Sequence, residues 1–357
     1  MAVMIRGKAL HLPILQGGMG VGISLERLAG AVAACGCMGT LSTAVCGFAE
    51  PDFDRNPFAA NLRALDRQVR RAKELSHGVG LVAVNAMVAT TQYADSVRTA
   101  LRAGADAIVC GAGLPRDLPA LAAEVPENDA ALAPIVSSGR AAGLICKLWD
   151  RRYGRIPDFL VLEGPQAGGH LGFSRQELEA PPALSALLKD VLSALAPFRE
   201  KAGRDIPVFV AGGVKNGADM ARYMREGAAG AQFATRFIAT EECDASEGYK
   251  QRLLAAQAFD IMLVKSPVGM PGRALRSPLI QRVEAGTQPP PERCMKCITT
   301  CDGKNAPYCI SRALIAARNG DWENGLFFCG ANAGEVNALS TVPQQINLIM
   351  EEWRNAQ

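Results

Sequence analysis

The sequence lacks a long apolar run, and it lacks a strong excess of charge of either sign. No apolar stretch reaches the roughly 18 residues that a membrane-spanning helix needs, and the opening stretch MAVMIRGKALHLPILQGG has too short an apolar segment for a signal peptide. Its 38 Lys and Arg residues against 35 Asp and Glu residues leave a net charge of only +3, with the basic residues scattered singly. We therefore expect a cytoplasmic protein with no membrane span, no nucleic-acid partner and a small-molecule substrate, and a homo-oligomer is compatible with these features.

Disorder and a disulfide framework are also disfavoured. Hydrophobic residues make up 49% of the chain and charged residues 20%, which is an ordinary globular composition with ample material for a core. The 11 cysteines are odd in number, and because no export signal is seen we expect reduced thiols.

Short apolar segments that alternate with helical patterns indicate parallel β/α units, because a parallel connection needs a crossover. Two segments, RAGADAIVCGAG and REGAAGAQFATR, repeat one unit: a helix end, a glycine and a buried strand. Eight strands predict an α/β fold of the (β/α)₈ TIM-barrel class, with a doubly wound open sheet as the alternative. The expected strands span 12–16, 38–42, 79–84, 106–110, 134–138, 158–162, 207–211 and 230–234, and the expected helices lie near 25–35, 61–76, 91–103, 116–123, 139–152, 183–201 and 216–226.

The pattern changes after residue 235. A helix is expected near 247–258, then an irregular Pro- and Gly-rich stretch, and a last helix near 340–354. We predict a barrel over residues 1–260 and a lid and C-terminal cap, packed on the barrel, over residues 261–357.

Loops that follow the strands of such a barrel converge on one face, where its active sites lie. Here those loops are rich in glycine and poor in charge, which suits a flat, largely uncharged ligand held by backbone groups. Gly212 and Gly213 lie between the seventh strand and a helix that starts near Asn216, so free N–H groups and the helix dipole are expected to hold a phosphate there. A tight turn without a ligand is the alternative explanation.

Seven segments of this kind occur in one order: LPILQGGMG, VNAM, GAG, EGPQAGGHLGF, PVFVAGGV, GAAGAQFATRF and KSPVGMPGRAL. Over about residues 10–280 this series resembles the FMN-dependent nitronate monooxygenase (2-nitropropane dioxygenase) family, which includes flavin-dependent enoyl-ACP reductases. The resemblance implies an FMN-binding TIM barrel and an oxidoreductase. It departs at Gln166, where relatives often carry Glu, and at Ala234, where Gly is usual.

The resemblance also implies roles for individual residues. Those expected to border the flavin ring are Gln16, Gly17, Gly18 and Met19; Asn85 and Glu163 are expected at its polar edge or ribityl chain, Gly168 and Gly169 beside it, and Gly212, Gly213, Ala234 and Thr235 around the phosphate. His170 is expected over the ring.

His170 is one of only three histidines, and it follows two glycines in a loop. An imidazole titrates near neutrality, so it suits removal of the α-proton of a nitroalkane or donation of a proton to Cα of an enoyl thioester. A histidine that only hydrogen-bonds its loop is the structural alternative. His11 and His77 lie outside the active-face loops and are expected in capping or surface roles.

Two activities therefore remain: a nitronate monooxygenase that needs no nicotinamide, and an NAD(P)H-dependent reductase of an activated double bond. A non-enzymatic flavin-binding sensor is a third, weaker hypothesis. In KSPVGMPGRAL, Lys265, Ser266 and Arg273 are expected near the barrel mouth, where they either meet a thioester's phosphate or cover the barrel.

Four cysteines lie close together in CMKCITTCDGKNAPYC. Cys294, Cys297, Cys301 and Cys309 are separated by two, three and seven residues. Three close cysteines and one further away are typical of iron–sulfur sites, whereas structural zinc usually takes two separated pairs. The spacing predicts one metal centre, a [4Fe–4S] cluster, with zinc or four reduced thiols as alternatives.

Overall fold

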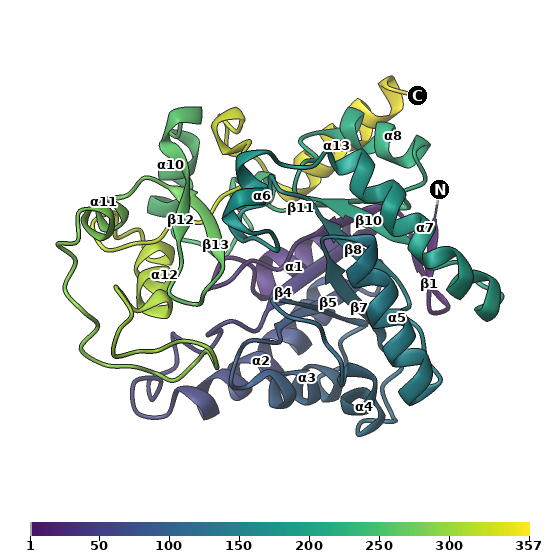
Figure 1. Cartoon of the computed structure of the whole chain (residues 1–357), viewed down its shortest axis with the longest axis horizontal. Helices are drawn as coiled ribbons and strands as arrows, with labels where there is room; N and C mark the ends of the chain where they lie inside the picture. The colour runs from purple at the N-terminus through teal and green to yellow at the C-terminus, as the bar shows by residue number, and fades with distance from the viewer. Residues whose placement is uncertain (1) are drawn as a thin grey trace.

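The structure, a computed structural model, describes residues 2–357. Eight parallel strands close into a barrel in the order β10-β11-β3-β4-β5-β6-β7-β8 (Figure 1). The (β/α)₈ prediction is therefore confirmed, and each expected strand is present within a few residues. The barrel strands are β3 (Ile14–Gln16), β4 (Met38–Ser42), β5 (Leu81–Met87), β6 (Ala107–Gly111), β7 (Ala131–Val136), β8 (Leu160–Glu163), β10 (Val208–Ala211) and β11 (Gly230–Phe233).

Alternate residues along each strand point to the two sides of the barrel wall. Ala83 of β5 belongs to the cluster inside the barrel, whereas its neighbours Val82 and Val84 pack outward with the helices. Inside the barrel, Phe159 and Phe209 meet edge to face with ring centroids 5.9 Å apart. Both faces are buried, which explains why the strands are apolar at consecutive positions.

Helices connect the strands and cover the barrel wall (Figure 1). Their ends follow local signals: the Asn56 side chain caps the helix that starts at Pro57, and Gly154 ends another helix in a left-handed conformation with φ of 58°. These helices are α1 (Glu26–Ala34), α2 (Pro57–Leu75), α3 (Tyr93–Arg102), α4 (Leu118–Ala123), α5 (Gly139–Tyr153), α6 (Arg175–Glu179), α7 (Leu184–Ala202), α8 (Gly217–Arg225) and α9 (Thr235–Ile238).

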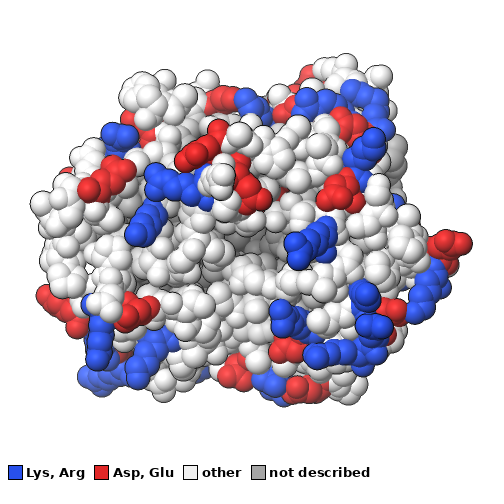
Figure 2. Space-filling model, viewed as in Figure 1, with Lys and Arg blue, Asp and Glu red and all other residues white. Residues whose placement is uncertain are grey.

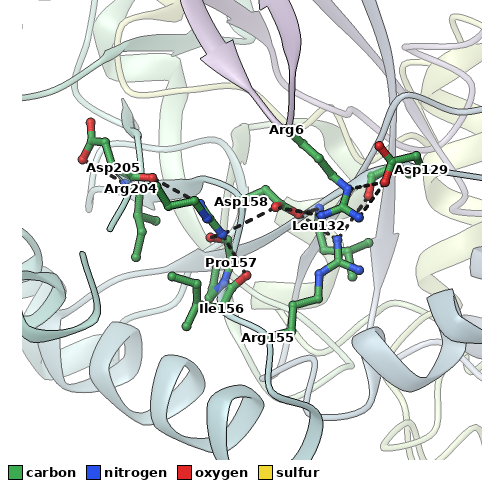
Figure 3. Close-up of polar contacts among 11 residues, drawn as sticks. Arg6, Asp129, Leu132, Arg155, Ile156, Pro157, Asp158, Arg204 and Asp205 are labelled. Carbon is green, nitrogen blue, oxygen red and sulfur yellow. Dashed lines mark hydrogen bonds and ion pairs between the residues drawn. The ribbon is translucent and has the colours of Figure 1, made fainter. Parts of the chain in front are cut away.

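A hairpin of β1 (Val3–Ile5) and β2 (Lys8–Leu10) closes the amino-terminal end of the barrel, where Ile5 and Leu10 join the inner cluster. Beside it, Asp158 is only 4% exposed. Its carboxylate accepts from Leu132 N at 2.8 Å and Arg155 Nη2 at 2.9 Å, and it lies 3.5 Å from Arg6 Nη1 and 3.6 Å from Arg204 Nη2 (Figure 3). Three arginines therefore surround one buried carboxylate at this end.

Residues 247–318 form a lid on the other side of the barrel from β1, whereas the last helix, residues 342–355, packs on α8 (Figure 1). The expected helices near 247–258 and 340–354 are present as α10 and α13. The sequence did not predict the hairpin of β12 and β13, which pairs with β9 in a three-stranded sheet, nor did it predict α11 and α12. The elements outside the barrel are β9 (Gly169–His170), α10 (Glu247–Leu254), β12 (Ile261–Lys265), β13 (Pro271–Leu275), α11 (Pro278–Glu284), α12 (Ile310–Arg318), α13 (Val342–Asn355) and two 3₁₀ helices, η1 (Ala258–Asp260) and η2 (Ala333–Glu335).

None of the helices in residues 2–357 combines the length and the apolar character that crossing a membrane requires.

Candidate active site

A cavity of about 270 Å³ opens at the carboxyl ends of the barrel strands, beneath the lid. Figure 2 shows a hollow near the centre of the face it presents, bordered mainly by uncharged residues. Among the Asp, Glu, Lys and Arg residues of the described chain, those that line the cavity are Glu163 and Arg236. The expected site residues that line it are Gly17, Gly18, Met19, Asn85, Glu163, Gly168, Gly169, His170, Gly212, Gly213, Ala234 and Thr235.

Gln16 lies behind the cavity wall and is fully buried. Its amide nitrogen donates to the carbonyl of Gly17, and its side-chain oxygen accepts from Thr40 N at 2.9 Å. The side chain therefore ties β3 to β4 and shapes the loop that does line the cavity.

Close approach explains the glycines at two cavity positions. A Cβ atom on Gly18 would lie 2.4 Å from Cβ of Asn85, which is too close for any side chain. Gly212 has a φ of +63°, and a Cβ there would lie 2.4 Å from the carbonyl oxygen of Gly164. The cavity wall is therefore backbone at both points.

The helix that was expected to hold a phosphate is already capped by the protein's own side chains. At the start of α8, Gly217 N donates to Glu352 Oε2 at 2.8 Å and Asp219 N donates to Asn216 Oδ1 at 2.9 Å. Glu352 also lies 3.4 Å from Arg236 Nη2 and so balances that charge. The backbone amides of Gly217 and Asp219 at the start of α8 are therefore already occupied and not available to a phosphate.

The loops after β10 and β11 contain backbone N–H groups without a hydrogen-bond partner in residues 2–357. The backbone N–H groups of Gly213, Ala234 and Thr235 make no hydrogen bond within residues 2–357, and all three residues line the cavity. Such converging amides suit an anionic group, so the residues present fit the phosphate of a flavin mononucleotide.

Glu163 ends β8 and is partly buried in the cavity wall. Burial raises the pKa of its carboxyl to about 7. Near neutral pH the group is therefore present both as acid and as carboxylate, so it can donate or accept a hydrogen bond at the polar edge of a ligand.

His170 faces the same cavity from β9. Its Nε2 lies 2.8 Å from Oγ of Ser266, and its ring packs edge to face on Phe328 with centroids 5.2 Å apart. Burial lowers the pKa of the imidazole to about 4, so the ring is neutral at neutral pH and able to accept a proton.

The lid motif KSPVGMPGRAL positions this histidine. Gly272 of β13 pairs with His170 of β9. The Arg273 guanidinium donates to the carbonyl oxygens of Pro165 at 2.9 Å and Ala167 at 2.6 Å, which orders the EGPQAGGH loop. Arg273 was expected either to meet a thioester's phosphate or to cover the barrel, and these hydrogen bonds favour the second role.

The sequence did not predict Phe328 as a site residue, because no local pattern marks it. The other two histidines, His11 and His77, are exposed on the surface away from this cavity.

The four clustered cysteines line a second, smaller cavity of about 20 Å³ in the lid. All four are free thiols, and Cys294 is exposed. Within residues 2–357, no three Cys, His, Asp or Glu side chains are arranged so as to hold a single metal ion. Cys297, Ile298 and Ile310 line both this cavity and the larger one.

A (β/α)₈ barrel with a neutral histidine and unused backbone amides at the carboxyl ends of its strands has the layout of a barrel enzyme. The family profile described as nitronate monooxygenase matches residues 3–352, and the chain belongs to that family.

The relatives with similar sequences or structures carry names of different proteins. The chain is 28% identical over 276 residues to (3aS,4S,5R,7aS)-5-hydroxy-7a-methyl-1-oxo-octahydro-1H-indene-4-carboxyl-CoA dehydrogenase of Mycobacterium tuberculosis, across 77% of this chain and 66% of that protein. It thus spans about two thirds of that relative's length. Among solved structures, FabK from Thermotoga maritima has a TM-score of 0.71 at 24% identity, covering 97% of this chain and 94% of that one. A nitroalkane oxidase from Streptomyces ansochromogenes has a TM-score of 0.70 at 20% identity, with 97% of both chains covered.

Proposed function

We propose that the protein is an FMN-dependent oxidoreductase that oxidises nitronates or nitroalkanes, with His170 as the proton-transfer group. The observation that carries this proposal is the neutral imidazole of His170, held by Ser266 in a cavity with almost no other charge. The whole-chain match to the nitronate monooxygenase family supports it.

The residues present define where FMN would bind. The unused amides of Gly213, Ala234 and Thr235, with Gly212, would hold the phosphate. The loop of Gly17, Gly18 and Met19 would border the ring, supported from behind by Gln16; Asn85 and Glu163 would meet its polar edge or ribityl chain, with Gly168 and Gly169 beside it. When bound, FMN supplies the electron-accepting chemistry.

The role of His170 depends on the substrate. A neutral nitroalkane carries an α-proton that a base must remove, and the neutral imidazole can take it. A nitronate has already lost that proton, so its oxidation needs no base. A comparison of the two substrates therefore isolates proton transfer by His170.

A reductase of an activated double bond is the second candidate. The relative from M. tuberculosis, which matches 77% of this chain, is named for an acyl-CoA substrate. In a reductase reaction of this chain, NAD(P)H would be the electron donor, and His170 would donate a proton to Cα once hydride has reached Cβ. Because Arg236 is paired with Glu352, no unpaired cationic side chain lines the cavity within residues 2–357, so the phosphates of a CoA ester would stay outside its mouth.

Anaerobic spectroscopy of the purified protein tests both candidates. We expect bound FMN whose absorbance is bleached by a nitronate without nicotinamide, and oxygen uptake once air is admitted. Rapid bleaching by NADH or NADPH with no response to nitronates would instead establish the reductase. His170→Ala should keep the flavin and the nitronate reaction but lose most turnover of the parent nitroalkane, with His11→Gln as the matched histidine control. A folded protein that takes up no FMN would end the flavin proposal.

We also propose that Cys294, Cys297, Cys301 and Cys309 bind a [4Fe–4S] cluster. Burial raises the pKa of Cys297 and Cys301, and the charge of Cys309 and Cys294 raises both further, as expected of neighbouring sulfur atoms. A tetrahedral zinc ion would need thiols about 3.8 Å apart around one point. Because iron and sulfide lie between its thiolates, a [4Fe–4S] cluster requires sulfur ligands that are further apart than those of a single zinc ion.

A further inference from the structure

We propose that a metal centre at the four cysteines fixes the outer wall of the active-site cavity, so that its occupancy controls how firmly the lid is closed. This inference rests on the metal centre proposed above and is independent of the choice between nitronate and thioester. The geometric basis is the shared wall: Cys297, Ile298 and Ile310 face the cysteine cavity on one side and the active-site cavity on the other.

The segment around Cys297 is docked on the loop between β5 and α3. Thr91 N donates to the carbonyl of Cys297 at 3.0 Å, and Thr299 N donates to the carbonyl of Ala89 at 2.9 Å. Between these bonds, Thr90 and Ile298 form an antiparallel bridge. Thr90 also lines the active-site cavity, so the lid and a barrel loop meet directly at the substrate space.

The other edge of the shared wall is the start of α12. Cys309 precedes Ile310, the first residue of this helix, and Ile310, Ser311 and Leu314 line the active-site cavity. The only side-chain bond from Cys297 to this helix is a contact of its Sγ with Oγ of Ser311 at 3.0 Å. A centre that joins the sulfurs of Cys297 and Cys309 would replace this weak contact with metal–ligand bonds.

Exposed basic residues lie close in sequence to the four cysteines, and the segment that carries them has no regular secondary structure of its own. Arg293, Lys296 and Lys304 are exposed and form no ion pair within residues 2–357, so their charge is available to offset four thiolates. Residues 286–309 contain no helix and no strand other than the single bridge at Ile298. The segment is held to residues 89–91 by hydrogen bonds of Lys296, Cys297 and Thr299, and ligands that join its cysteines would restrict its opening further.

The test is metal analysis combined with hydrogen exchange on the full chain purified without oxygen. We expect about four iron and four sulfide atoms per chain and little zinc. We further expect slow exchange in peptides that cover 86–92 and 294–300. Cys294→Ser removes a ligand that does not line the active-site cavity, and it should lose the metal and speed exchange in both peptides by about tenfold or more. Cys35→Ser, at a half-buried thiol outside the cluster, is the matched control and should change neither.

A second experiment separates loss of the metal from misfolding of the Cys294→Ser variant. Native protein stripped of metal by a chelator should show the same faster exchange, and reconstitution with iron and sulfide should reverse it. If the metal is removed and exchange in the two peptides does not change, the proposed link between metal occupancy and lid closure is wrong. If the native protein contains no metal, or zinc alone, the proposed iron–sulfur centre is wrong. FMN content, read by absorbance in the same samples, should stay constant, because the phosphate loops follow β10 and β11. A loss of FMN from metal-containing protein would count against the flavin site instead.

Discussion

The Nε2 atom of His170 and the hydroxyl oxygen of Ser266 lie 2.8 Å apart, although 96 residues separate them in the chain. The N–H group of Val268 donates to the same hydroxyl oxygen at 3.4 Å. That oxygen has a second lone pair that can accept from Nε2–H, and in this tautomer the lone pair of Nδ1 is free to take a proton. Ser266 therefore joins the lid hairpin to the loop after β8 and holds the ring of His170 in one place.

The pH dependence of nitroalkane turnover should report this buried imidazole. Because burial lowers its pKa to about 4, the neutral base is present at all pH values above about 4. The acidic limb of kcat/KM is therefore expected near pH 4, whereas an exposed histidine would place it near pH 6.5. Steady-state kinetics with a nitroalkane measure the limb, and the residual activity of His170→Ala should lack it. If the acidic limb of kcat/KM lies near pH 6.5 and persists in His170→Ala, it arises from another titrating group.

Gly212→Ala should abolish FMN retention. The glycine has a φ of +63°, and a Cβ would lie 2.4 Å from the carbonyl oxygen of Gly164, so the loop must move away from the phosphate position. Gly203→Ala is the matched control, because its φ is +60° but no atom lies within 4 Å of the new Cβ. The ratio of flavin to protein absorbance after purification should fall at least tenfold in the first variant only, by the usual relation of about 1.4 kcal/mol to tenfold in affinity.

Glu163→Gln should change how the stability of the FMN-free protein depends on pH. The folded-state pKa is raised from the ordinary 4.5 to about 7, so between these values the folded chain holds a proton that the unfolded chain has lost. The native protein is therefore stabilised below pH 4.5 and loses this contribution as the pH rises through 7. Glutamine carries no titrating proton, so the variant should exceed the native free energy of unfolding by on the order of 2 kcal/mol above pH 7.

Urea titrations at pH 5 and pH 8 make that comparison. The native free energy of unfolding should fall more steeply between the two than that of the variant. Parallel curves for both proteins would show that Glu163 is ionised in the fold throughout.

Asp158→Asn should destabilise the closed end of the barrel. The 4% exposed carboxylate is surrounded by Arg6, Arg155 and Arg204, and loss of its charge leaves three cations without their shared partner (Figure 3). We expect a loss of about 3 kcal/mol in the free energy of unfolding. Asp129→Asn, at an exposed carboxylate that pairs with Arg6, should cost less than about 1 kcal/mol. Equal losses in the two variants would contradict a special role for the buried carboxylate.

Much of the barrel was predictable because its signals are local. Each of these signals, namely an apolar strand or the glycine or polar residue at a helix end, lies within a few residues, and together they place the eight barrel strands correctly. The same locality explains why His170 stood out, since two glycines and the end of a buried strand immediately precede it. Short strands with proline or glycine, such as Pro271–Leu275 of β13, carry no such signal.

By itself the sequence determined eight β/α units and the loops at their carboxyl ends, because continuously apolar strands between helices must bury both faces of a parallel sheet. Closure of that sheet into a barrel, rather than a doubly wound open sheet, was decided by the tertiary structure. Only the tertiary structure decided which groups meet across long separations. Glu352 of α13 accepts a hydrogen bond from Gly217 N at the start of α8, where the sequence predicted that helix N–H groups would help to hold a phosphate. The cysteine segment docks on Thr91 and so becomes a wall of the cavity. These contacts depend on how the lid packs on the barrel, which no local pattern of residues encodes.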